Sequence, residues 1–111
     1  MPRLPDARRA TIEPAKIYDY LLSAAHPVGR FKAVFFRSLG YSADRWQVLR
    51  DDFLELARSA EVVATHTTPF GRKFEVDGTP TGPGGRSAAV RTVWIVRALD
   101  EAPRLVTANP R

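Results

Sequence analysis

Hydrophobic residues recur at intervals of three and four positions from about residue 13 to residue 60, which is the spacing of amphipathic helices. Pro14 suits a first helical position. The dipeptide His26-Pro27 interrupts the pattern, because the residue before a proline is pushed out of the α region. The spacing therefore predicts three helices, at about residues 13–23, 28–39 and 42–60.

Beyond residue 60 the pattern changes to alternation, which predicts strands. We expect strands at residues 61–68, 72–76, 87–97 and 105–108. Gly and Pro mark the turn at 69–71 and the loop at 77–85, and a further turn is expected at 99–103. The predicted class is α+β, with three N-terminal helices packed on one face of a four-stranded antiparallel meander sheet. The other face of the sheet is left open.

With 111 residues, of which 44% are hydrophobic, the chain is long enough to bury a core without disulfides or metals. We expect one domain over residues 1–111, in which residues 1–12 form an extended N-terminal segment. The chain has no cysteine and two histidines that lie far apart, so no metal site or cofactor is expected. No apolar run is long enough to span a membrane, and no signal peptide is evident, which favours a cytoplasmic protein.

The chain is basic, with 17 Lys and Arg against 12 Asp and Glu, a formal net charge of +5 and an isoelectric point near 10.2. This balance favours polyanionic partners, RNA among them, but does not select one. Only three of the cations are lysines, at positions 16, 32 and 73. Lys32 and Lys73 therefore stand out.

Lys32 has the least expected position of these cations. It projects from the middle of an apolar arc on the second helix. The arc consists of Val28, Phe31, Phe35, Phe36 and Leu39. A cation there, near a helix N-terminus, is unfavourable unless it is paired or aimed at a site. Either the side chain buries its stem and keeps its ammonium in water, or it binds an anion or takes part in catalysis.

Other candidate residues lie at the start of the second helix and on two strands. His26 and Arg30 flank a helix N-terminus, whose free N–H groups attract anions. His26 either caps the helix or belongs to a phosphate or oxyanion site. Lys73 alternates outward on its strand and is either solvated or in contact with phosphate. His66 is interpreted as a surface or cross-strand residue.

The third predicted strand is apolar on both faces, which is typical of a central strand. Trp94 on this strand either fills the core or stacks on a base of RNA. Arg91 either pairs with a carboxylate or binds phosphate, and the carboxylate candidates are Asp51, Asp52 and Glu75.

Missing motifs exclude several reaction classes. The chain has no Gly-rich phosphate loop between a strand and a helix, no serine nucleophile elbow and no Cys/His pair. The carboxylates of the third helix suit a solvated face better than a two-metal site. What remains is acid–base and electrostatic catalysis by His, Lys and Arg, the groups that can cleave RNA through its own 2′-hydroxyl.

Three stretches carry a resemblance to a known family: HPVGRFKAVFFRSLGY at residues 26–41, VRTVWIV at 90–96 and PRLVTANP at 103–110. These motifs resemble, over essentially the whole chain, a family of small bacterial proteins known only as a domain of unknown function, which implies no activity. The order of elements and a Thr-x-Tyr-Pro-like end are distantly similar to the barnase, EndoU, colicin and RelE superfamily of metal-independent ribonucleases, many of them toxins. Here the end reads TANP, with Asn109 where an aromatic residue is expected.

The leading hypothesis is a metal-independent endoribonuclease, the toxin of a toxin–antitoxin pair, with RNA as substrate and a small cognate antitoxin as partner. Its site would lie between the N-terminus of the second helix and the open face of the sheet. Lys32 and Arg91 would stabilise the charge of the phosphorane, and His26 would act as general acid or base. Thr107 would orient a phosphate or a hydroxyl.

Three further residues complete this hypothesis. Arg30 and Lys73 would hold flanking phosphates, and Trp94 would contact the RNA. Two alternatives remain at this stage. One is a non-enzymatic protein-binding module that forms a complex with a neighbour-encoded partner, and the other is an RNA-binding protein without catalysis.

Overall fold

The computed structural model describes residues 2–98 and 101–111, so the first two residues of the turn expected at 99–103 lie outside the described residues. The helical elements are η1 (Ala7–Arg9), α1 (Pro14–Lys16), η2 (Ile17–Leu21), α2 (Arg30–Ser38), η3 (Ala43–Arg45) and α3 (Trp46–Ser59). The strands are β1 (Val62–Thr68), β2 (Gly71–Gly78), β3 (Val90–Val96) and β4 (Arg104–Pro110).

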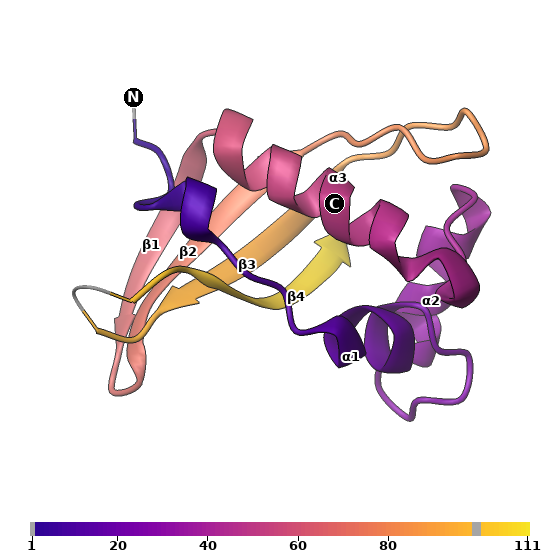
Figure 1. Ribbon diagram of the computed structural model, residues 1–111, viewed down its shortest axis with the longest axis horizontal. Helices are drawn as coiled ribbons and strands as arrows, with labels where there is room; N and C mark the ends of the chain where they lie inside the picture. Colours follow the sequence, from indigo (N-terminus) through magenta and orange to yellow (C-terminus); the bar gives the residue numbers. More distant parts are fainter. Residues whose placement is uncertain (1, 99–100) are drawn as a thin grey trace.

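The four strands form one antiparallel sheet in the order β1-β2-β3-β4, so each strand pairs with its neighbours in the sequence. Figure 1 shows α3 lying across one face of the sheet, with α1 and α2 gathered beside one end of it. The predicted α+β class, with three helices before a four-stranded antiparallel meander, is confirmed. Within the described residues, no helix combines the length and the apolar character needed to cross a membrane.

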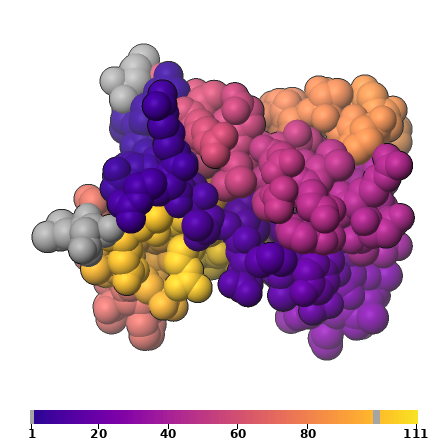
Figure 2. Space-filling view, in the orientation of Figure 1, coloured from indigo at the N-terminus to yellow at the C-terminus, as the bar shows by residue number. Residues whose placement is uncertain are grey.

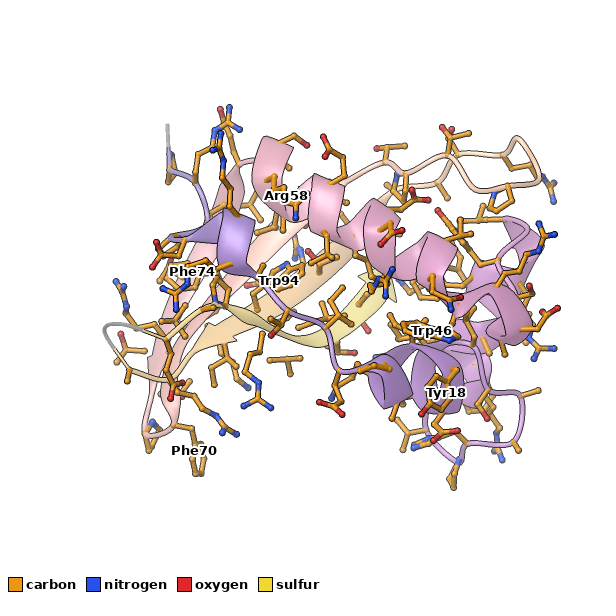
Figure 3. All side chains as sticks on the ribbon, viewed as in Figure 1. Tyr18, Trp46, Arg58, Phe70, Phe74 and Trp94 are labelled. Carbon is orange, nitrogen blue, oxygen red and sulfur yellow. The ribbon has the colours of Figure 1, made fainter. Side chains whose placement is uncertain are left out.

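The core centres on Trp94, which lies beneath α3 and is fully buried (Figure 3). Its indole N–H donates to the Thr92 hydroxyl at 2.8 Å, and that hydroxyl donates to the carbonyl oxygen of Val76 at 2.8 Å. A fully buried indole presents no face to a nucleobase. The structure therefore makes Trp94 a core residue, and its expected contact with RNA does not fit this position.

The first predicted helix is less regular than its spacing suggests. Its residues divide into the short α1 and the single π-helical turn η2. The second helix begins at Arg30, two residues later than predicted. A π-helical turn holds one more residue than an α-helical turn, so the side chains that follow are rotated around the axis. The faces of this region therefore could not be assigned from a spacing of 3.6 residues.

Part of the predicted apolar arc on α2 is exposed. Val28 and Phe31 are 62% and 70% exposed, whereas Phe36 is fully buried. The buried face of α2 is centred on Ala33 and Phe36. Lys32 therefore lies at the edge of the buried face rather than in the middle of it, and its half-buried side chain is free to reach polar groups of other elements.

The N-terminal segment is mostly extended but contains the turn η1. The backbone N–H of Thr11 donates to the carbonyl oxygen of Pro103 at 2.9 Å, and the N–H of Leu105 donates to the carbonyl oxygen of Thr11 at 3.1 Å. The side chain of Ile12 is buried in the core. Figure 2 shows this segment, in indigo, against the yellow β4 and the pink α3. The segment thus braces the edge strand β4.

Candidate functional site

Three polar side chains from three elements meet at the β4 edge of the sheet. The ammonium of Lys32, on α2, donates to the Tyr20 hydroxyl at 2.8 Å and to the Thr107 hydroxyl at 2.7 Å. The two hydroxyl oxygens are 3.4 Å apart. Tyr20 comes from η2 and Thr107 from β4. We call this group the Lys32 cluster. Lys32 and Thr107 were candidate residues in the sequence, and Tyr20 was not.

A close backbone approach brings Tyr20 next to α2. Gly29 is buried just before the first residue of α2, and a Cβ atom there would lie 2.1 Å from the carbonyl oxygen of Tyr20. No side chain fits at that distance, so only glycine allows η2 and α2 to approach this closely. The absence of a side chain at Gly29 thus sets the distance between the elements that carry Tyr20 and Lys32.

An irregularity in β4 aims Thr107 at the cluster. Leu105 pairs with Trp94 and Thr107 pairs with Val93, which leaves Val106 as an extra residue in β4. Without this bulge, strict alternation from the buried Leu105 would turn Thr107 toward the core. With the bulge, Thr107 shares the face of Val93, away from α3, where Lys32 reaches it from the edge of the sheet.

Contacts within the cluster change the acidity of Tyr20. Partial burial raises the pKa of its hydroxyl, but the hydrogen bonds with Lys32 and Thr107, together with the positive charge of Lys32, outweigh it. The pKa of Tyr20 is therefore held below its ordinary value of 10.0. The Lys32 ammonium has three N–H donors and uses two of them here, so one remains for a ligand.

His26 stands beside the cluster and caps the chain entering α2. Its Nδ1 accepts hydrogen bonds from the backbone N–H groups of Val28 at 3.0 Å and Gly29 at 2.9 Å. In the neutral ring the proton therefore belongs on Nε2, which is left as a donor. The ring also meets the ring of Tyr20 edge-on, with their centroids 5.0 Å apart. His26 is thus both a cap and a neighbour of the Lys32 cluster.

The cluster opens into a hollow with a volume of about 650 Å³, which we call the Lys32 hollow. Its lining includes the cluster residues, His26, Lys16 and Asp19. Lys16 lies 5.9 Å from the centre of the Tyr20 ring. The hollow thus offers a cation with a spare donor, a tyrosine of lowered pKa and an imidazole N–H to one ligand. This set suits an anion that must gain or lose a proton.

Arg91 does not belong to this group. Its guanidinium donates to both carboxylate oxygens of Asp77, at 2.8 and 3.0 Å, and lies 3.3 Å from Glu75. Arg91 is thus held by carboxylates, and Glu75 is one of the partners that the sequence offered. His66 contacts the same Glu75 at 2.6 Å, in keeping with its expected cross-strand role. The structure does not bring Arg91 into the lining of the Lys32 hollow.

The two residues expected to hold flanking phosphates lie in different places. Arg30 is exposed on α2, with its guanidinium 4.8 Å from the centre of the Phe31 ring. Lys73, on β2, lines a second hollow on the open face of the sheet, together with Arg97 and Arg104. Among the described residues, no three His, Asp or Glu side chains form a group able to hold a metal ion.

Sequence reasoning missed Tyr20 because the pattern of residues 13–23 predicts a regular amphipathic helix. On such a helix Tyr20 has no feature that separates it from Tyr18. The residue that could have drawn attention to it is Gly29, since a glycine just before a helix can mark a close approach of two backbones. The glycine indicates that another backbone lies close to it, but it does not indicate which segment that is.

Comparisons with known proteins place the chain in a family and in a fold. A family model described as "Domain of unknown function (DUF6883)" matches residues 3–111. No curated protein matches the chain. A solved chain from the "Contact-dependent growth inhibition toxin - immunity protein complex from Klebsiella pneumoniae 342" is similar, with a TM-score of 0.74 and 22% identity. The similarity covers 96% of this chain and 97% of that chain, so the two share a fold.

Proposed function

This chain belongs to the DUF6883 family of unknown function, and we propose that it is a metal-independent endoribonuclease that acts as a toxin. The observation that carries the proposal is the Lys32 cluster. It places an ammonium group 2.8 Å from a tyrosine of lowered pKa, at the mouth of an open hollow in a basic protein. RNA is the substrate because its 2′-hydroxyl supplies the nucleophile, so the protein needs to supply only proton transfer and positive charge.

In the proposed reaction the 2′-oxygen attacks the adjacent phosphorus and the bond from phosphorus to O5′ breaks. The products are a 2′,3′-cyclic phosphate and a free 5′-hydroxyl. Tyr20, as phenolate, takes the proton of the 2′-hydroxyl, and Lys32 gives a proton to the departing O5′. A proton then passes from Tyr20 to Lys32 along their 2.8 Å hydrogen bond and restores both groups.

The neighbouring residues bind and orient the phosphate. Thr107 holds the Lys32 ammonium in place and orients a phosphate oxygen or the 2′-hydroxyl. His26 donates from Nε2 to a phosphate oxygen, because its Nδ1 already accepts two backbone N–H groups. His26 therefore acts as a donor in this scheme and not as the general acid or base first expected. Arg91, tied to Asp77, has no part in the chemical step.

A toxin role is supported by the fold and by the distant similarity to the barnase, EndoU, colicin and RelE superfamily. A solved structure with this fold is a complex of a contact-dependent growth inhibition toxin with an immunity protein. By analogy, this chain is the toxin half of a pair, and its partner is a small protein encoded beside it. The net charge of +5 favours an acidic partner.

The test is cleavage of a short RNA by the purified chain in the presence of EDTA. The product should carry a 2′,3′-cyclic phosphate, and a substrate with a 2′-deoxyribose at the cleaved position should remain intact. Lys32→Met keeps the stem and removes the ammonium, so the rate should fall about 100- to 1,000-fold. Arg86→Gln, in the loop before β3, removes one charge outside the lining of the Lys32 hollow, so this variant should cleave RNA normally. Absence of any cleavage by the wild-type chain would refute the proposal.

A second candidate function, a protein-binding module without catalysis, is favoured by a specific observation. Val28, Phe31 and Val34, in and just before α2, are 62%, 70% and 70% exposed. An exposed apolar group of this kind is typical of a surface that another protein covers. Copurification with a neighbour-encoded protein, lost in Phe31→Ser, together with no RNA cleavage, would favour this function over the first.

A further inference from the structure

A second hollow, with a volume of about 380 Å³, adjoins the Lys32 hollow on the open face of the sheet. We call it the hairpin hollow, because it reaches the turn between β1 and β2. The two hollows share Glu13, Lys16 and Val106 in their linings. The two hollows therefore adjoin each other at these three residues.

The hairpin hollow is strongly positive. Its lining contains four cations, Lys16, Lys73, Arg97 and Arg104, and its one carboxylate is Glu13. Within the part of the chain that the structure describes, none of these four forms an ion pair, whereas Arg91 and Arg111 are paired with Asp77. Cations without carboxylate partners remain available to the phosphates of a nucleic acid.

An exposed aromatic ring stands at the far end of this hollow. Phe70 occupies the turn between β1 and β2 and is 77% exposed, although it also lines the hollow. Figure 3 shows it projecting from the hairpin tip, away from the body of the protein. A phenyl ring next to a row of cations is the arrangement on which an unpaired base stacks while its backbone follows the charges.

We propose that the substrate is single-stranded RNA and that it runs from the Lys32 hollow across β4 to Phe70. The phosphate to be cleaved lies at Lys32, the next phosphates lie along Lys16, Arg104 and Lys73, and a base stacks on Phe70. A duplex is a poor ligand, because its bases are paired and offer no free face to Phe70. This inference rests on the proposed function for the position of the cleaved phosphate, and on the hairpin hollow for the path.

The experiment measures binding without cleavage, using a fluorescein-labelled 2′-O-methyl RNA of ten nucleotides that the proposed reaction cannot cleave. Phe70→Ala should weaken binding about 5- to 150-fold, the loss expected for one stacked base. In Lys73→Gln/Arg104→Gln, the negative slope of log affinity against log salt concentration should become less steep by about 1.4, which corresponds to two phosphate contacts on a single strand.

A matched double variant, Arg58→Gln/Arg86→Gln, removes the same charge from α3 and from the loop before β3, and it should leave affinity and slope close to wild type. A double-stranded RNA of the same length should bind more weakly than the single strand and should not respond to Phe70→Ala. Equal binding by Phe70→Ala and wild type would overturn the proposal. So would binding of an acidic peptide, but not RNA, in a manner that depends on Phe70.

Failure of this inference and failure of the proposed function are distinguishable. If the path is wrong and the function right, the wild-type chain cleaves a decanucleotide and a dinucleotide, and Phe70→Ala slows neither. If the function is wrong and the path right, neither RNA is cleaved, while the 2′-O-methyl decanucleotide still binds in a Phe70-dependent manner. If both are right, Phe70→Ala slows cleavage of the decanucleotide and leaves the dinucleotide unaffected.

Discussion

Replacing Gly29 with alanine tests whether the close approach of η2 and α2 builds the Lys32 cluster. The new Cβ would lie 2.1 Å from the carbonyl oxygen of Tyr20, and Cβ contacts below 3.0 Å are essentially never observed. One of the two backbones must therefore move by about 0.9 Å. A shift of that size along the line from Lys32 to Tyr20 lengthens their hydrogen bond from 2.8 Å to about 3.7 Å, beyond hydrogen-bonding distance.

Two effects of Gly29→Ala on stability oppose each other. Gly29 has helical angles, φ −73° and ψ −19°, so alanine would by itself stabilise the folded state by about 0.5–1 kcal/mol. Overpacking costs about 1–3 kcal/mol. The clash is with a backbone carbonyl, which cannot rotate away like a side chain, so the upper part of that range applies. We expect a net destabilisation of about 1–2 kcal/mol.

Urea unfolding of Gly29→Ala beside the wild type measures this loss, and RNA cleavage measures the state of the cluster. Gly84→Ala is the matched control, because a Cβ there comes no closer than 3.3 Å to any atom, so the Leu39 carbonyl has to yield by only a few tenths of an ångström. Its free energy of unfolding should change by less than about 0.5 kcal/mol. If Gly29→Ala were as stable as the wild type and equally active, the close approach would not be what positions Tyr20 beside Lys32.

Three further predictions concern the sheet and the cluster. The hydrogen bond from Arg91 holds the pKa of Asp77 below its ordinary value, although partial burial acts to raise that pKa. Stability should thus fall as pH falls through that lowered pKa, and Arg91→Met should show a smaller loss in urea unfolding from pH 7 to pH 2, because only Arg111 then remains paired with Asp77. Thr92→Val leaves the indole N–H of Trp94 without its acceptor and should cost about 1–3 kcal/mol in thermal unfolding, whereas Thr92→Ser should cost much less. Single-turnover cleavage should accelerate with rising pH up to the lowered pKa of Tyr20, and a Tyr20→Phe enzyme that kept this rise would exclude the tyrosine as base.

The sequence was sufficient to predict the order of helices and strands because the period of the hydrophobic pattern changes once, near residue 60. The first two expected strands were followed by stretches rich in Gly and Pro, and the third by a short segment ending at Pro103, so pairing of each strand with its neighbours as a meander was the expected arrangement. The extra residue in β4 could not be foreseen, because the pattern of polar and apolar residues at 105–107 does not distinguish a regular strand from a strand with a bulge. That single residue decides whether Thr107 faces the core or the site.

Lys32 shows how sequence reasoning can assign two neighbouring residues to one site through an incorrect premise. The apolar arc placed Lys32 in the middle of a buried face, yet Val28 and Phe31 of that arc are largely exposed. Lys32 reaches Thr107 because it sits at the edge of the buried face, from which a long side chain extends past the sheet edge. The helical period shows where apolar residues lie on a helix, but the neighbouring elements determine which of those residues become buried. Here η2 and β4 determine which side of α2 is covered.

The position of Tyr20 changes the meaning of Asn109. A Thr-x-Tyr-Pro-like end would carry its aromatic residue two positions after the threonine, and Asn109 has no phenol to offer. The hydroxyl of Tyr20 nevertheless lies 3.4 Å from that of Thr107, although 87 positions separate the two residues. A phenol can act on a bound phosphate from any element that brings its oxygen to the right place, since proton transfer depends on distance and pKa and not on chain position. Thr107 therefore has a neighbouring tyrosine although the end of β4 carries no aromatic residue, and in the proposed chemistry that tyrosine comes from η2.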